Sequence, residues 1–121
     1  MDQRPPLISV VIPAYDASEG LSACVDALEQ QTVPREEYEI IVVDNGLEDT
    51  AVKVIADRYG VTFLTQSQRG AAAARNLGAR HARGEILLFT DADCIPESNW
   101  IEVMTAPFAD PEIAATGGYV L

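Results

Sequence analysis

Residues 85–93 read EILLFTDAD, an apolar run that is followed at once by two carboxylates, Asp91 and Asp93. A short apolar run without alternation is typical of a strand buried on both faces, as in a parallel sheet covered by helices. Two carboxylates so close at the end of such a strand repel each other. A divalent cation, Mg²⁺ or Mn²⁺, would relieve that repulsion because it takes carboxylate and phosphate oxygens together. The stretch therefore predicts a strand that presents Asp91 and Asp93 to a cation, and the alternative is a solvated turn stabilised by Asp93.

The same unit of apolar strand and amphipathic helix repeats on the N-terminal side of this stretch. Leu21, Cys24, Val25 and Leu28, for example, have the i, i+3, i+4, i+7 spacing of one helix face. The pattern predicts strands over residues 7–12, 39–43, 61–65, 85–90 and 113–121, and helices over residues 18–31, 50–60 and 70–82 with a short last helix capped by Ser98. Strict alternation of strands and helices predicts an α/β fold, with three α/β/α layers around a mostly parallel, twisted sheet.

Three polar loops follow three of the predicted strands: PAYD at residues 13–16, DNG at residues 44–46 and DAD at residues 91–93. Ligands of such sheets bind beyond the carboxyl ends of the strands, so we expect the three loops to form one site. Asp44 could hold a ribose, accept a hydrogen bond from a base, or simply form the turn in DNG. The first strand is not followed by G-x-G-x-x-G, which disfavours a nicotinamide enzyme.

The segment GAAAARNLG, residues 70–78, predicts a helix whose small residues let it lie close to the sheet. Arg75 is the large, charged side chain among them. A guanidinium near the acidic loops could pair with Asp91 or with a phosphate. The alternative is an exposed arginine on a helix surface.

Composition limits the partners of the chain. The 121 residues carry 8 Lys and Arg against 19 Asp and Glu, a formal net charge of -11 that argues against binding to a nucleic-acid backbone. The length suits one domain over residues 1–121. We expect a cytoplasmic protein, because the N-terminus lacks the pattern of a signal peptide, no apolar run reaches the roughly 18–20 residues of a membrane span, and the two cysteines read as free thiols.

Taken in order, the segments SVVIPAYDASEGLSACVDAL, EIIVVDNGLED and GAAAARNLGARHARGEILLFTDADCIPESNW resemble the nucleotide-sugar-binding half of a family-2 glycosyltransferase with a GT-A fold. The resemblance runs from about Ile8 to Gly118 and implies a Rossmann-like half of that fold. It also implies roles for individual residues in nucleotide and metal binding. The loop of Pro13, Ala14 and Tyr15 would pack on the nucleoside, Asp44 would bind a uracil-type base, Arg75 would line the nucleotide pocket, Asp91 would face the ribose and metal, and Asp93 would be the ligand of Mn²⁺ or Mg²⁺.

The reaction implied by the resemblance is an inverting transfer of a sugar, most simply from a UDP-sugar, to the hydroxyl of an unknown saccharide or lipid-linked acceptor. The cation would neutralise the departing diphosphate. Asn45 and Leu47 stand where the family often has Asp and Ser, so the base pocket departs from the common pattern.

The catalytic base of the family lies in a C-terminal acceptor half, which we expect residues 1–121 to lack. A second hypothesis is therefore a non-catalytic nucleotide-sugar-binding module or a truncated fragment. A sheet that ends at residues 113–121 would leave an uncovered apolar edge, through which we expect a homodimer. The inner face of a membrane is an expected location for an enzyme with a lipid-linked acceptor.

Overall fold

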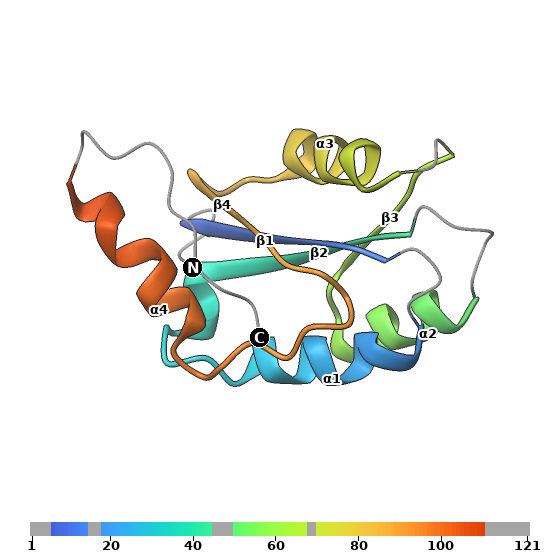
Figure 1. Ribbon diagram of the computed structural model, residues 1–121, viewed down its shortest axis with the longest axis horizontal. Helices are drawn as coiled ribbons and strands as arrows, with labels where there is room; N and C mark the ends of the chain where they lie inside the picture. Colours follow the sequence, from blue (N-terminus) through green and yellow to red (C-terminus); the bar gives the residue numbers. More distant parts are fainter. Residues whose placement is uncertain (1–5, 15–17, 45–49, 68–69, 111–121) are drawn as a thin grey trace, which may run out of the picture.

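The computed structural model describes residues 6–14, 18–44, 50–67 and 70–110 of the chain. They contain one sheet in the order β3-β2-β1-β4, and each neighbouring pair of strands is parallel (Figure 1). The strands are β1 (Ile8–Pro13), β2 (Tyr38–Asp44), β3 (Thr62–Thr65) and β4 (Ile86–Phe89). The predicted parallel sheet is thus confirmed for this part of the chain, whereas the fifth strand expected at residues 113–121 lies outside the described residues. The expectation that β4 is buried on both faces is wrong, because Leu87 and Phe89 are 36% and 39% exposed.

Helices cover both faces of the sheet, which confirms the three-layer α/β/α arrangement. Helix α3 (Ala71–His81) lies on one face, and α1 (Ser18–Glu29) and α2 (Thr50–Tyr59) lie on the other (Figure 1). The remaining elements are the 3-10 turn η1 (Arg35–Glu37) before β2, then α4 (Trp100–Thr105) and the 3-10 turn η2 (Ala106–Ala109). None of the helices in the described ranges is long and apolar enough to cross a membrane.

Two expected boundaries differ from the structure. Pro13 is the last residue of β1 rather than the residue after it. Its missing N–H is tolerated because the pairing of β1 with β4 has already ended at Val11. Helix α4 follows Asn99 and not a Ser98 cap. The Ser98 carbonyl accepts a hydrogen bond from Thr32 N at 2.8 Å. This bond fixes Ser98 outside the helix, one residue before the N-cap position of Asn99.

The core is divided by the sheet. Val10 and Ile12 of β1 are fully buried against α1 and α2, whereas Val11 is fully buried on the side of α3. On that second side Gly78 of α3 comes so close to β1 that a Cβ atom there would lie 2.4 Å from Val11 Cγ1. Small residues therefore set the distance between α3 and the sheet, as the GAAAARNLG segment predicts.

The order of the strands places a topological switch point between β1 and β4. From β1 the chain moves to β2 and β3 on one side and then crosses to β4 on the other side of β1. Helices α1 and α2 of the first branch lie on one face of the sheet, and the crossover helix α3 lies on the other. Ligands of open α/β sheets bind at such a switch point, outside the carboxyl ends of the strands. Asp91 and Asp93 follow the end of β4 and so lie beside that switch point.

A buried polar network joins the strands at the opposite edge of the sheet. The Ser9 hydroxyl donates to Glu39 Oε2 at 2.6 Å and accepts from Gly84 N at 2.8 Å. The same carboxylate accepts from Arg83 N at 2.7 Å and from Arg83 Nε at 3.3 Å. Glu39 is 9% exposed, so its charge is tolerated only because these donors surround it. The network stabilises the connection between α3 and β4.

The pKa of Glu39 predicts how this network responds to acid. Burial raises the pKa, but hydrogen bonds from Ser9 and Arg83 and the charge of Arg83 outweigh burial, and the net pKa is lowered from 4.5. A lowered pKa in the folded state means that the contribution of Glu39 to the free energy of unfolding is complete above the pKa of the unfolded chain and is lost as the pH falls through the folded pKa. We expect urea unfolding of Glu39→Gln to show a weaker loss of stability below pH 4.5 than the unsubstituted protein. Parallel curves for the two proteins would contradict the role of the carboxylate.

Candidate functional site

The loop after β4 presents two carboxylates on one side. Thr90 continues the pairing of β4 through a hydrogen bond from its N to Val11 O at 3.2 Å. Thr90 and Ala92 are buried, whereas Asp91 and Asp93 are exposed. Because Ala92 packs into the core between them, both carboxylates are held at the surface at the carboxyl end of the sheet. The predicted platform is therefore present.

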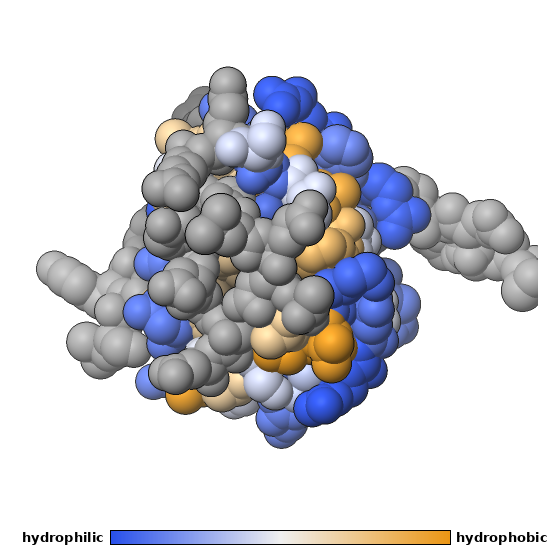
Figure 2. Space-filling model, turned by 90° about the vertical axis from the view of Figure 1, so that its right-hand side faces the viewer, coloured by the Kyte–Doolittle hydropathy of each residue, from blue (hydrophilic) through white to orange (hydrophobic). Residues whose placement is uncertain are grey.

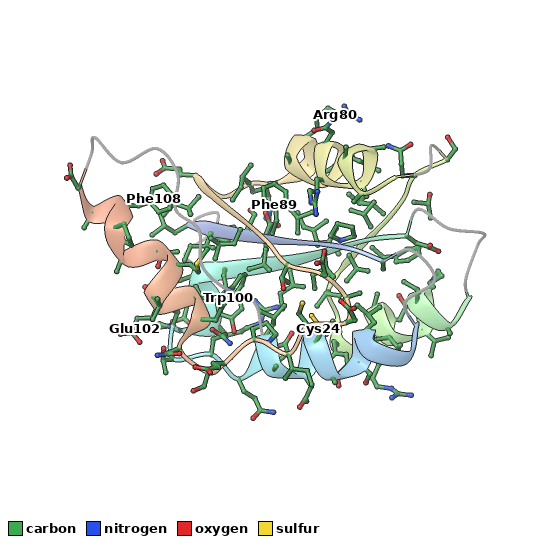
Figure 3. The ribbon with its side chains drawn as sticks, viewed as in Figure 1. Cys24, Arg80, Phe89, Trp100, Glu102 and Phe108 are labelled. Atoms are coloured by element: carbon green, nitrogen blue, oxygen red, sulfur yellow. The ribbon has the colours of Figure 1, made fainter. Side chains whose placement is uncertain are left out.

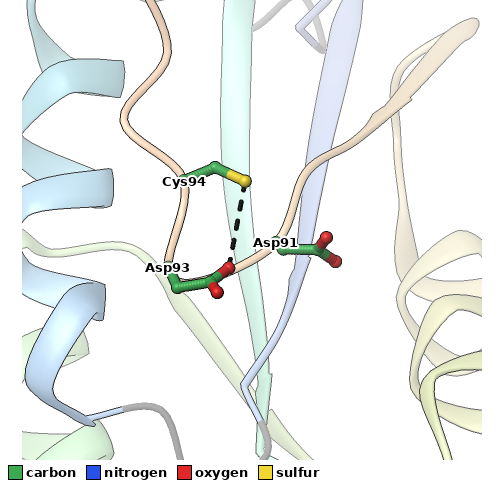
Figure 4. A group of neighbouring side chains, drawn as sticks. All are labelled: Asp91, Asp93 and Cys94. Atoms are coloured by element: carbon green, nitrogen blue, oxygen red, sulfur yellow. Dashed lines mark hydrogen bonds between the residues drawn. The ribbon is translucent and has the colours of Figure 1, made fainter. Parts of the chain in front are cut away.

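The Cys94 thiol lies beside the two carboxylates. One carboxylate oxygen of Asp91, one of Asp93 and Cys94 Sγ all lie within 4.8 Å of one another (Figure 4). The turn is closed by a hydrogen bond from Cys94 N to Asp91 O at 3.1 Å, and the thiol lies 3.9 Å from Asp93 Oδ1. Burial raises the pKa of Cys94 above its ordinary value and outweighs the backbone hydrogen bond at Asp91, which lowers it, so the thiol stays protonated at neutral pH. The donors that fit a hard cation here are the carboxylate oxygens.

Arg75 of α3 reaches the acidic pair from the other face of the sheet. Its Nη2 atom lies 3.8 Å from Asp91 Oδ1, and the two side chains are 44% and 63% exposed. An ion pair so exposed contributes little to stability. Its effect is to orient the two side chains, and it corresponds to one of the two pairings expected for Arg75.

The carboxyl ends of β1 and β2 lie side by side at the same edge of the sheet. Ala14 N donates to Val43 O at 2.8 Å, which extends the register of β1 and β2 and places Ala14 next to Asp44. Ala14 is fully buried and Asp44 is 3% exposed. The predicted neighbours of the nucleoside thus include Pro13, Ala14 and Asp44 at one edge, whereas Tyr15 lies outside the described residues.

Two further residues beside the acidic loop belong to α1 and were not expected to have a role there. A Cβ atom on Gly20 would lie 3.0 Å from Asp93 Cα, and Cys24 Sγ lies 3.5 Å from Asp91 O. Burial, followed by the charges of Cys94, Asp93 and Asp91, raises the pKa of Cys24 to about 12, so its S–H is retained. For Gly20, the sequence offers one signal of such a role: it is a glycine in the first turn of an expected helix, and glycine is unfavourable in helices.

The surface at this end of the molecule is mixed. Viewed from the side where β1 and β2 end, hydrophilic residues of the described part border smaller hydrophobic areas (Figure 2). The chain is thus an α/β domain with an acidic pair at the switch point of a parallel sheet, where open α/β sheets generally bind their ligands. The chain belongs to glycosyl transferase family 2, whose family model matches residues 9–120.

Relatives with curated names are glycosyltransferases. The chain is 36% identical to glycosyltransferase AglE of Haloferax volcanii over an alignment that covers 95% of this chain and 40% of that protein. It is 34% identical to the validoxylamine A glucosyltransferase of Streptomyces hygroscopicus subsp. jinggangensis over 88% of this chain and 26% of that protein. The chain thus spans less than half the length of these relatives.

Solved structures show the same fold. The mannosyltransferase PcManGT of Pyrobaculum calidifontis, in complex with GDP-Man and Mn²⁺, is 31% identical with a TM-score of 0.68 over 78% of this chain and 29% of that chain. TarS 1-349 of S. aureus in complex with UDP has a TM-score of 0.73 at 24% identity, over 86% of this chain and 32% of that chain. These neighbours are GT-A glycosyltransferases, so the expected fold class is confirmed.

Proposed function

We propose that this chain binds the diphosphate of a nucleotide-sugar through a divalent cation held by Asp93 and Asp91, as the donor-binding part of an inverting glycosyltransferase. The observation that carries the proposal is the pair of exposed carboxylates at the carboxyl end of β4, with oxygens within 4.8 Å of each other and beside the switch point. Support comes from PcManGT, a member of the same fold solved with GDP-Man and Mn²⁺.

Different residues of the site bind different parts of the nucleotide-sugar donor. Pro13, Ala14 and Tyr15 contact the nucleoside, and Asp44 accepts a hydrogen bond from its base. Arg75 orients Asp91, 3.8 Å away, and adds positive charge near the phosphates. Bound Mn²⁺ or Mg²⁺ supplies electrostatic stabilisation of the charge that develops on the diphosphate.

The reaction itself is a single displacement. An acceptor hydroxyl forms a bond to the anomeric carbon while the bond from that carbon to the diphosphate oxygen breaks, and the hydroxyl proton passes to a base. None of the described residues is assigned as that base. We propose that it lies in an acceptor-binding half outside residues 1–121, and the acceptor stays unidentified.

Calorimetry with UDP, UDP-glucose and GDP-mannose, each with and without Mn²⁺, tests the proposal. We expect nucleotide binding that depends on Mn²⁺, with UDP ligands favoured over GDP-mannose. Binding that is equal with and without Mn²⁺ would overturn the proposal. Release of UDP from UDP-glucose in the presence of candidate acceptors then separates a transferase from the non-catalytic binding module.

Asp44→Ala should weaken UDP binding about tenfold, because a hydrogen bond to a charged acceptor contributes about 1.5 kcal/mol. The effect of Mn²⁺ on the affinity should persist, since Asp44 is the last residue of β2 and not part of the loop after β4. Asp44→Asn, of matched shape, should give an intermediate affinity. Unchanged UDP affinity in Asp44→Ala would contradict the assignment to the base.

Two further expectations stay predictions. The homodimer was expected through residues 113–121, which lie outside the described residues. The cytoplasmic location was inferred partly from unpaired cysteines, and the structure shows Cys24 and Cys94 as free thiols.

A further inference from the structure

Helix α1 lies along the segment that carries the two aspartates. Figure 3 shows Cys24 between α1 and the chain that follows β4. Residues near the start, in the middle and just after the end of α1 contact residues 91–101, at intervals along the whole segment. They are Gly20, Cys24 and Gln31.

The far end of the segment is held by Gln31. Its Nε2 donates to Glu97 O at 2.7 Å, and its Oε1 accepts from Ile101 N at 2.9 Å. These bonds connect α1 to the start of α4. The segment between β4 and α4 therefore lies against one helix at both of its ends.

Gly20 is the closest contact of α1 with the aspartates. A Cβ atom at this position would lie 3.0 Å from Asp93 Cα and 3.1 Å from Ala92 O. Both are backbone atoms, which move only if the loop itself moves. The absence of a side chain at Gly20 thus allows the loop to lie where Asp91 and Asp93 approach each other.

Cys24 follows Gly20 by one helical turn and lies next to the backbone of the other aspartate, Asp91. Its side chain is fully buried, and its Sγ donates to Asp91 O at 3.5 Å. That carbonyl also accepts the hydrogen bond from Cys94 N. The thiol thus supports the turn through the backbone carbonyl of Asp91.

We propose that Gly20 and Cys24 are positioning residues that set the spacing of Asp91 and Asp93 for the cation. This inference rests on the proposed function, because it concerns the same metal-dependent nucleotide site. The spacing of two ligand oxygens decides whether one ion can contact both, since Mg²⁺ demands near-ideal geometry. Residues that hold ligands in place typically change metal affinity by about 10- to 100-fold.

The test compares UDP affinity with and without Mn²⁺ in Gly20→Ala and Cys24→Val, with the Mn²⁺ EPR spectrum as a second readout. We expect the ratio of the two affinities to fall about tenfold in each variant. UDP affinity without Mn²⁺ should stay unchanged. Alanine favours a helix over glycine, so an effect on helix stability alone would change the melting temperature of Gly20→Ala and leave the ratio of the two affinities unchanged.

Rescue and control variants complete the design. Cys24→Ser keeps a donor and should restore most of the Mn²⁺ effect that Cys24→Val loses. Val25→Ala, a fully buried neighbour on the same helix, should lower the melting temperature and leave the ratio unchanged.

Three outcomes would overturn the inference. If Gly20→Ala and Cys24→Val keep the ratio of the unsubstituted protein, neither residue positions the aspartates. If Val25→Ala lowers the ratio equally, the effect is one of general destabilisation. If the unsubstituted protein itself shows no Mn²⁺ effect, the proposed function fails and the inference fails with it.

Discussion

Replacing Asp93 with alanine is expected to abolish the Mn²⁺-dependent part of UDP binding, a loss of about 100-fold or more. The exposed carboxylate is one of the two that lie within 4.8 Å at the end of β4, and Asp91 alone offers fewer oxygens to the ion. A loss of 100-fold corresponds to about 2.7 kcal/mol of binding free energy. Calorimetry of UDP with and without Mn²⁺ measures it directly.

The control for this experiment is another exposed aspartate. Asp57 of α2 pairs with Lys53 at 2.8 Å on the helix surface, and Asp57→Ala changes the net charge by the same amount. It should leave the Mn²⁺ effect unchanged. A thermal shift with Mn²⁺ and UDP that survives Asp93→Ala would count against the assignment of Asp93 as a ligand.

Gly84→Ala is expected to lower the free energy of unfolding by about 3 kcal/mol, because the new methyl group overlaps the backbone of β1. A Cβ atom at this position would lie 2.7 Å from Ile8 C and 2.7 Å from Ser9 Oγ. Relief requires the strand to move, which also breaks the hydrogen bond from Gly84 N to Ser9 Oγ. The melting temperature should fall by about 10 °C.

Gly60→Ala separates steric overlap from backbone strain. Gly60 ends α2 with φ of 67°, and nothing lies within 4 Å of an added Cβ atom. Alanine there costs only the left-handed conformation, about 1 kcal/mol. We therefore expect Gly84→Ala to be clearly the more destabilised of the two. Equal melting temperatures would show that the strand adapts to the methyl group.

Most of the fold could be predicted from local patterns. Apolar runs, amphipathic spacing and a glycine such as Gly60 act over a few residues, and each strand and helix of the described part lies within two residues of its predicted bounds. The exception at Ser98 arose because its carbonyl bonds Thr32, a partner distant in the chain. The order of the strands in the sheet could not be predicted from the alternation of strands and helices. That alternation predicts parallel strands but not which strand lies beside β1.

The candidate site shows the same division. The pair of aspartates after one apolar strand and Asp44 at the end of another are features of contiguous sequence, and periodicity sufficed to place them at one edge of a sheet. Glu39 appeared in the sequence only as the first residue of a strand, and its partners Ser9 and Arg83 come from other segments.

The features of the site that the sequence pattern did not predict depend on contacts between distant segments. Gly20 and Cys24 carry no motif, and their relation to residues 91–93 exists only because α1 packs beneath the end of β4. Local sequence encodes backbone preference and burial, which determine the elements and the residue types at their ends. The spacing of the two carboxylates depends on close packing between segments about 70 residues apart, a three-dimensional property that no short stretch of the chain contains.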